Sequence, residues 1–258
     1  MNPNNQNKMY QWANDLFPIC RSISGEGVRQ TLNYCKNLHP EILIKKFKSG
    51  EKVLDWVIPD EWNIKDAYVS KLNGEKIIDF KNNNLHIVSY SIPINKIISK
   101  KELLEHIHTR DDIPDAIPYI TSYYSKDWGF CISENFKKTI TENKYKVVIE
   151  SSLKKGDMNY GECLIQGKSK KEIVFSTYIC HPSMANNELS GIVVSLSLIE
   201  NLKNSDNYYS YRFLFLPETI GSIAYISKNL KNLKKNTLCG FVLTCMGNKN
   251  NFSYMPSR

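Results

Sequence analysis

The segment Thr177-Tyr-Ile-Cys-His181-Pro-Ser-Met-Ala-Asn186-Asn187-Glu188-Leu-Ser190-Gly191 marks a point where an apolar strand gives way to a polar loop and then to the start of a helix. A buried strand that ends at a histidine brings that side chain to the edge of a sheet, where open α/β sheets bind ligands. Asn186, Asn187 and Glu188 add oxygen-bearing groups at the helix start, where the helix dipole favours negative charge. An ordinary capped helix with a hydrogen-bonded histidine would show the same pattern.

Two later strands end in the same way. The run Phe213-Leu-Phe-Leu-Pro217 leads directly to Glu218, and Thr244-Cys-Met-Gly-Asn248 follows the next apolar strand. Helix capping alone explains three successive polar strand ends poorly, so we expect these side chains to line one cleft. A shared site requires that His181 and Glu218 lie within roughly 12 Å of each other. The residues expected there are His181, Asn187, Glu188, Glu218 and Asn248.

The pattern of the C-terminal half predicts an α/β fold. Strands are expected at 145–151, 160–166, 171–179, 210–216 and 239–245, with helices at about 186–203 and 220–231. The last three strands are nearly continuous apolar runs, which is typical of strands covered by helices on both faces. The chain stops soon after the last of them, so we expect the α/β domain to be incomplete at its C-terminal end.

The N-terminal half is organised differently. Amphipathic helices are expected at 8–18 and from Ser24 to about residue 38, and short strands separated by turn residues then run from Ile42 to residue 90. A short helix at 100–108 leads into a proline-punctuated segment. These features predict a small β-rich domain at 51–112, inserted into an α/β domain made of 1–50 and 113–258.

Composition excludes several classes of protein. The 258 residues are 41% hydrophobic and carry a net charge of +8, which excludes a disordered chain. Lysine far outnumbers arginine and is spread along the chain, as an AT-rich genome would produce, so nucleic acid binding is a minor alternative. The seven cysteines include no C-x-x-C pair and are expected to be reduced. No apolar run approaches the roughly 20 residues of a membrane span, and the N-terminus has no signal-type apolar core, which favours the cytoplasm.

A set of motifs in fixed order resembles a known family. They are His-Pro-Ser-x-Ala-Asn-x-x-Leu-Ser-Gly from His181, Pro-Glu-Thr-Ile-Gly-Ser from Pro217, Thr-Cys-x-Gly from Thr244, and, upstream, segments 17–29, 56–62, 117–124 and 128–131. The sequence looks like the aminopeptidase-like proteins found among bacterial polysaccharide-biosynthesis genes. That family is similar in fold to the zinc aminopeptidases with two co-catalytic metals. The resemblance implies a mixed sheet with helices on both faces and an inserted β-rich domain.

The resemblance also implies roles for individual residues. His181 matches a zinc ligand, Glu218 a general base, and Asn187 the position of a metal-bridging aspartate. Thr219 and Asn248 fall where the family has further carboxylate ligands. Neutral amides cannot supply the charge that bound dications require, and Glu188 lies one residue from the matching position. We therefore expect at most one Zn²⁺, bound weakly, through His181, Asn187, Glu188 or Asn248.

Two functions are compatible with these residues and motifs. One is metal-assisted hydrolysis of a peptide or an amide-bearing small molecule, with Glu218 as the base and activity weakened by the lost ligands. The other is a non-catalytic binding or scaffold protein that retains the aminopeptidase fold. Arg21 and Arg29 flank the Ser-Gly-Glu-Gly turn and could clamp a substrate carboxylate, or could form ordinary salt bridges within the chain.

Overall fold

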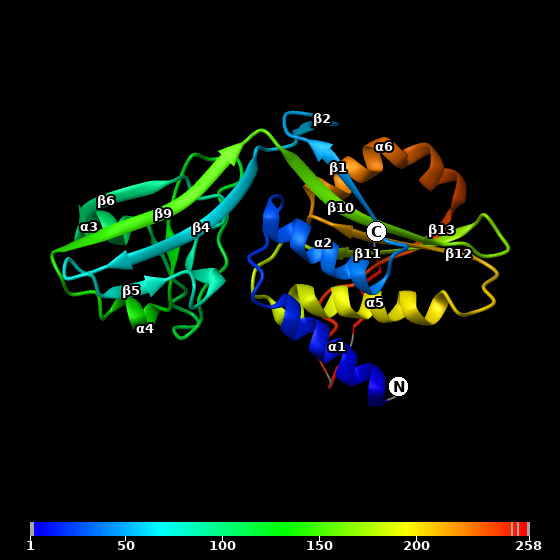
Figure 1. Cartoon of the computed structure of the whole chain (residues 1–258), viewed down its shortest axis with the longest axis horizontal. Coiled ribbons are helices and arrows are strands. Elements are labelled where there is room, and N and C mark those ends of the chain that lie inside the picture. Colours follow the sequence, from blue (N-terminus) through cyan, green and yellow to red (C-terminus); the bar gives the residue numbers. More distant parts are fainter. Residues whose placement is uncertain (1–2, 249, 252, 257–258) are drawn as a thin grey trace. The chain divides into compact units, whose positions relative to one another are not determined.

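The computed structural model describes residues 3–248, 250–251 and 253–256. The chain divides into two compact units (Figure 1). One contains residues 1–58 and 157–258, and the other contains residues 59–156. The second unit is larger than the β-rich domain expected at 51–112, and its own strand pairing explains the difference.

The first unit carries an α/β fold. Its helices are α1 (Pro3–Leu16), α2 (Glu26–Leu38), a π-helical turn (Ala185–Leu189), α5 (Ser190–Leu202) and α6 (Ile220–Asn236). Its strands are β1 (Leu43–Lys48), β2 (Lys52–Val53), β3 (Trp56–Val57), β10 (Asp157–Ile165), β11 (Glu172–Tyr178), β12 (Ser210–Leu216) and β13 (Thr237–Val242).

A five-stranded mixed sheet in the order β1-β10-β12-β11-β13 forms the centre of this unit. Strands β1 and β10 are antiparallel, as are β10 and β12, whereas β11 runs parallel to both β12 and β13. The carboxyl ends of β11, β12 and β13 therefore lie at the same edge of the sheet. This confirms the expected mixed sheet, and it is the arrangement that brings three strand ends together.

Helices cover both faces of the sheet (Figure 1). On one face, side chains of α1, α2 and α5 form a single apolar cluster with alternate residues of the strands, including Leu32, Leu196, Cys163, Phe213 and Phe215. The residues between them on the strands point to the other face, which α6 covers. The period-two alternation of the strands thus separates the two layers.

The α6 face holds a buried ionic cluster. Arg212 of β12 donates hydrogen bonds to Glu162 of β10 and to both carboxylate oxygens of Glu172, and the hydroxyl of Tyr225 in α6 donates to Glu162 at 2.7 Å. Lys45 of β1 also pairs with Glu162. Burial lowers the pKa of Arg212, but the hydrogen bond to Glu172 and the nearby Tyr225 and Glu162 outweigh it and raise this pKa above its usual range. Every charge in the cluster therefore faces an opposite charge.

The second unit is built on a four-stranded antiparallel sheet in the order β5-β4-β9-β6. Its elements are β4 (Glu61–Ser70), β5 (Lys76–Asp79), a 3₁₀ turn (Asn84–His86), β6 (Ile94–Ser99), α3 (Lys100–Glu105), β7 (Ile107–His108), β8 (Phe130–Cys131), α4 (Glu134–Lys137) and β9 (Lys144–Lys154). Strand β9 pairs with β4 along one edge and with β6 along the other. Residues 113–156 therefore belong with this unit rather than with the α/β domain.

All seven cysteines are free, and Cys35, Cys131, Cys163 and Cys180 are buried. Burial raises the pKa of Cys35 to about 12 and that of Cys163 to about 11, so these thiols stay protonated in the core. Within the described part of the chain, the helices are too short or too polar to cross a bilayer.

Candidate functional site

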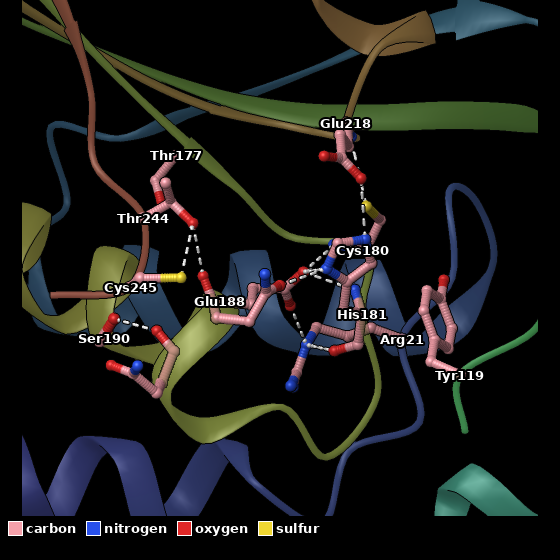
Figure 2. A network of polar contacts seen from close by, with 12 residues as sticks. Arg21, Tyr119, Thr177, Cys180, His181, Glu188, Ser190, Glu218, Thr244 and Cys245 are labelled. Carbon is pink, nitrogen blue, oxygen red and sulfur yellow. Dashed lines mark hydrogen bonds and ion pairs between the residues drawn. The ribbon is translucent and has the colours of Figure 1, made fainter. Parts of the chain in front are cut away.

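His181 follows β11 and lies at the shared carboxyl edge of the parallel strands. Its Nδ1 lies 2.8 Å from Oδ1 of Asn187, and its Nε2 lies 3.1 Å from Oε2 of Glu218 (Figure 2). Oxygen atoms thus face both ring nitrogens, and the imidazole can donate to both only when it carries two protons. The structure brings together the two residues that the sequence placed at separate strand ends.

Glu218 follows β12, and its backbone is hydrogen-bonded to the side chain of Cys180. Its backbone N–H donates to Sγ of Cys180, 3.2 Å away, while its side chain remains 44% exposed. The next residue, Thr219, has a φ of 59°, an uncommon conformation for a residue with a side chain. This backbone turn lets the chain leave the strand and begin α6 directly after Glu218.

The segment after β13 is hydrogen-bonded to the π-helical turn of residues 185–189 and to the start of α5. The Thr244 hydroxyl donates to the carbonyl oxygen of Asn187 at 2.8 Å, and the backbone N–H of Gly247 donates to Oδ1 of Asn186 at 2.8 Å. The backbone N–H of Met246 donates to the hydroxyl of Ser190 at 2.8 Å. These contacts place the start of α5 against the third strand end, and π-helical turns of this kind are frequent at functional sites.

Glu188 lies at the centre of this arrangement with no exposed side-chain surface. Its Oε1 accepts a hydrogen bond from Nε of Arg21 at 2.8 Å, and Arg21 is equally buried. Its Oε2 accepts hydrogen bonds from the backbone N–H groups of Cys180 and His181 (Figure 2). Both carboxylate oxygens are therefore engaged within the chain.

The remaining predicted residues have local partners. Oδ1 of Asn248 accepts a hydrogen bond from the backbone of Asn250 in its own turn, and Asn248 is exposed. Arg29 pairs with Glu26 at 2.9 Å on α2, and Arg21 pairs with Glu188. Both arginines therefore form salt bridges within the chain, the second of the two roles considered for them.

Sequence reasoning missed two features of the site. Cys180 supports the backbone of Glu218, yet in the sequence it looks like one more core residue in an apolar strand. The Arg21–Glu188 pair joins residues 167 positions apart, and no periodic pattern links them. Buried charges are almost always paired, but the sequence does not show that Glu188, which follows two asparagines in a polar loop, is buried.

Zinc is the metal that the resemblance implies, and the residues present do not fit a two-zinc centre. Among the described residues, Cys180, His181 and Glu188 each place one potential ligand atom within 4.8 Å of the others. However, Arg21 already balances the charge of Glu188, and burial raises the pKa of the Cys180 thiol well above its usual range, so the thiol stays protonated. Asn187 and Thr219 offer only neutral amide and hydroxyl oxygens, which are not among the usual zinc ligands of Cys, His, Asp and Glu.

Comparison with known proteins identifies related chains. A Clostridium acetobutylicum protein named "Putative polysaccharide biosynthesis protein with aminopeptidase-like domain" is 48% identical over 240 residues, which are 93% of this chain and 55% of that protein. A crystal structure from the same organism, described as a "putative peptidase", superposes with a TM-score of 0.91 at 48% identity and covers 94% of this chain and 57% of that one. The chain thus spans little more than half the length of these relatives.

More distant structures share the fold. The zinc aminopeptidase BSAP from Bacillus subtilis superposes with a TM-score of 0.61 at 13% identity, over 93% of this chain and 68% of that one. An aminopeptidase from Aneurinibacillus sp. strain AM-1 gives a TM-score of 0.53 at 13% identity, over 95% and 71% of the two chains. A family model described as "Domain of unknown function (DUF4910)" matches residues 10–258. The chain therefore belongs to the DUF4910 family and has a fold of the zinc-aminopeptidase type.

Proposed function

We propose that this chain is an aminopeptidase-fold domain that binds a peptide or another small molecule with a free amine, in polysaccharide biosynthesis, without two-zinc hydrolysis. The observation that carries the proposal is that Glu188 is buried and paired within the chain, which leaves it unable to serve as a charged metal ligand. Its charge is balanced by Arg21 and both of its oxygens accept hydrogen bonds from the chain, so it holds the fold of the site together. The resemblance implies an aminopeptidase centre at this position, and the residues present lack the negative charge that two metals need.

Glu218 is the group suited to contact the ligand. Its carboxylate is nearly half exposed at the strand edge, beside the imidazole of His181. A carboxylate in this position can accept charge-assisted hydrogen bonds from a protonated amine, and such bonds are stronger than those between neutral groups. The α-ammonium group of a peptide or the amine of an amino sugar would meet this requirement. The ligand class is therefore defined by a free amine.

Paired ligands test this role. We expect the dipeptide Leu-Gly to bind at least tenfold more tightly than N-acetyl-Leu-Gly, a difference of about 1.4 kcal/mol, because acetylation removes the charged amine. Calorimetric titration would measure both affinities. The preference should disappear in Glu218→Gln and persist in Glu41→Gln, a control carboxylate that is 48% exposed in the same unit. Equal affinity for the two dipeptides, or binding of neither, would reject the proposed ligand class.

A metal-dependent hydrolase is the second candidate. The contact between His181 and Glu218 favours it, since it retains one possible metal ligand and one possible general base at the expected strand ends. A catalytic zinc usually needs three protein ligands, and these two residues alone fall short. In such a hydrolase His181 would hold the metal, which would activate water, and Glu218 would accept a proton.

Zinc titration separates the two candidates. We expect the unmodified chain to bind at most one Zn²⁺ weakly, and to hydrolyse aminoacyl anilides no faster than Glu218→Gln. Asn187→Asp adds a negative charge beside His181 and should increase zinc affinity about tenfold, whereas Asn248→Asp, in an exposed turn, should change it little. Tight binding of two zinc ions by the unmodified chain would favour the hydrolase instead.

A further inference from the structure

The buried pair of Arg21 and Glu188 has a defined geometric relation to His181. Glu188 Oε2 accepts a hydrogen bond from the backbone N–H of His181, and Nε of Arg21 donates to the backbone carbonyl of His181 at 3.1 Å. The two members of one ion pair therefore hold both polar backbone groups of this residue. Glu188 also holds the preceding N–H, that of Cys180, at 2.8 Å.

Arg21 is itself fixed by its surroundings. Its Nη1 donates to the carbonyl oxygen of Leu16 at the end of α1, 2.7 Å away. The chain around it packs tightly against the first turn of α2, because a β-carbon at Gly27 would lie only 1.9 Å from the carbonyl oxygen of Cys20. The guanidinium is thus anchored on the end of α1 and reaches the residues that follow β11.

We propose that Arg21 is a positioning residue that, directly and through Glu188, fixes the backbone of His181 and so holds its imidazole against Glu218. Three segments that are distant in the sequence meet at this pair: the N-terminal segment, the end of β11 and the π-helical turn. The hydrogen bonds of the pair hold them together. A guanidinium suits the task because its Nε–H is shared between Glu188 and the His181 carbonyl while Nη1 donates to Leu16, so one side chain meets acceptors on three segments. The inference rests on the proposed function only in taking His181 and Glu218 as the pair beside the ligand.

The main test replaces both members of the pair. Removing Arg21 alone would leave an unpaired buried carboxylate and could prevent folding, whereas unbranched apolar residues of similar size are often tolerated in place of a buried ion pair. We therefore choose the double variant Arg21→Met/Glu188→Met. The matched control is Arg29→Met/Glu26→Met, which removes the exposed pair on α2.

Two readouts distinguish positioning from general stability. The first is the ¹⁵N chemical shifts of the His181 ring, assigned among the five histidines by comparison with His181→Gln. The second is the affinity for Leu-Gly. In the folded double variant we expect the His181 ring signals to shift or broaden and the affinity to fall about tenfold, with both unchanged in the control.

The outcomes are separable. A folded double variant with wild-type His181 ring signals would overturn the positioning role, whether or not its affinity for Leu-Gly changes. A double variant that fails to fold while the control folds would also overturn it, because the pair would then support the core as a whole rather than one residue. If the unmodified chain binds no dipeptide, the proposed function fails, but the ring signals still test the positioning role.

Discussion

At the scale of single residues, His39 should make stability depend on pH. Its ring is buried, with 2% of the residue exposed, and meets the ring of Trp12 edge-on at 6.5 Å. Burial, and then the charge of Lys203, lower the pKa of His39 below its usual value of 6.5. The unfolded chain therefore takes up a proton at this residue before the folded chain does. Stability should be complete above pH 6.5 and fall as the pH drops below it.

The variant His39→Phe provides the comparison. One proton difference gives a slope of at most about 1.4 kcal/mol per pH unit in the free energy of unfolding. Urea unfolding at pH 7.5, 6.5 and 5.5 would show this slope as the difference between the two proteins, which cancels the contributions of the other histidines. Parallel pH profiles would show that His39 is not the group responsible.

The residues of the site divide into those that the sequence can reveal and those that it cannot. His181 and Glu218 were predicted to lie together because each follows an apolar run, and parallel strands end at one edge. Arg21 and Glu188 were named as separate candidates, but their pairing was not foreseen. Pairing between distant residues depends on how the helices dock on the sheet, which no local pattern encodes.

At the scale of elements, α5 begins in close contact with the segment that follows β13. A β-carbon at Gly191 would lie 2.3 Å from the carbonyl oxygen of Leu243 and 2.4 Å from the hydroxyl of Thr177. Only glycine allows this approach, and the same packing brings the π-helical turn to the third strand end.

Gly191→Ala should therefore destabilise the fold. Overpacking costs up to about 3 kcal/mol, and the close backbone oxygen at 2.3 Å puts this variant near that limit. Alanine regains about 1 kcal/mol in helix propensity, so a net loss of about 2 kcal/mol is expected. The matched control is Gly240→Ala in β13, where the nearest atom would be 3.6 Å away. Denaturant midpoints would measure both. A neutral Gly191→Ala would mean that the helix start can shift without cost.

Element types were predicted better than element boundaries. The expected strands at 171–179 and 210–216 correspond closely to β11 and β12. The helix expected from about residue 186 begins instead as a π-helical turn, because hydrogen bonds from Met246 and Gly247 and the burial of Glu188 shape its first turn. Tertiary contacts of this kind are invisible to helical periodicity.

At the scale of the whole molecule, the two ends of the inserted segment 59–156 join the first unit close to each other. Lys48 pairs with Asp157 across β1 and β10, and the backbone N–H of Gly50 donates to the carbonyl of Ile58. Replacing 59–156 by a short Gly/Ser linker should therefore leave a first unit that unfolds cooperatively. Circular dichroism during thermal unfolding would test this, and loss of a cooperative transition would contradict it.

Excision of 51–112, the range that the sequence suggested, serves as the comparison. It would remove β4 and β6, the two neighbours of β9, and leave both edges of that strand unpaired. Unpaired strand edges promote aggregation, so this protein should be insoluble where the other excision is not. Sequence reasoning misplaced the boundary because β9 resembles a strand of the α/β domain and only its pairing shows otherwise.

The distance along the chain between Arg21 and Glu188 has a consequence for synthesis on the ribosome. The two residues are 167 positions apart, which at about 5–20 residues per second corresponds to roughly ten to thirty seconds of translation. Residues 59–156 are contiguous and emerge complete within that interval. The inserted unit can therefore finish folding before Glu188 has been synthesised, so the candidate site should form after the inserted unit.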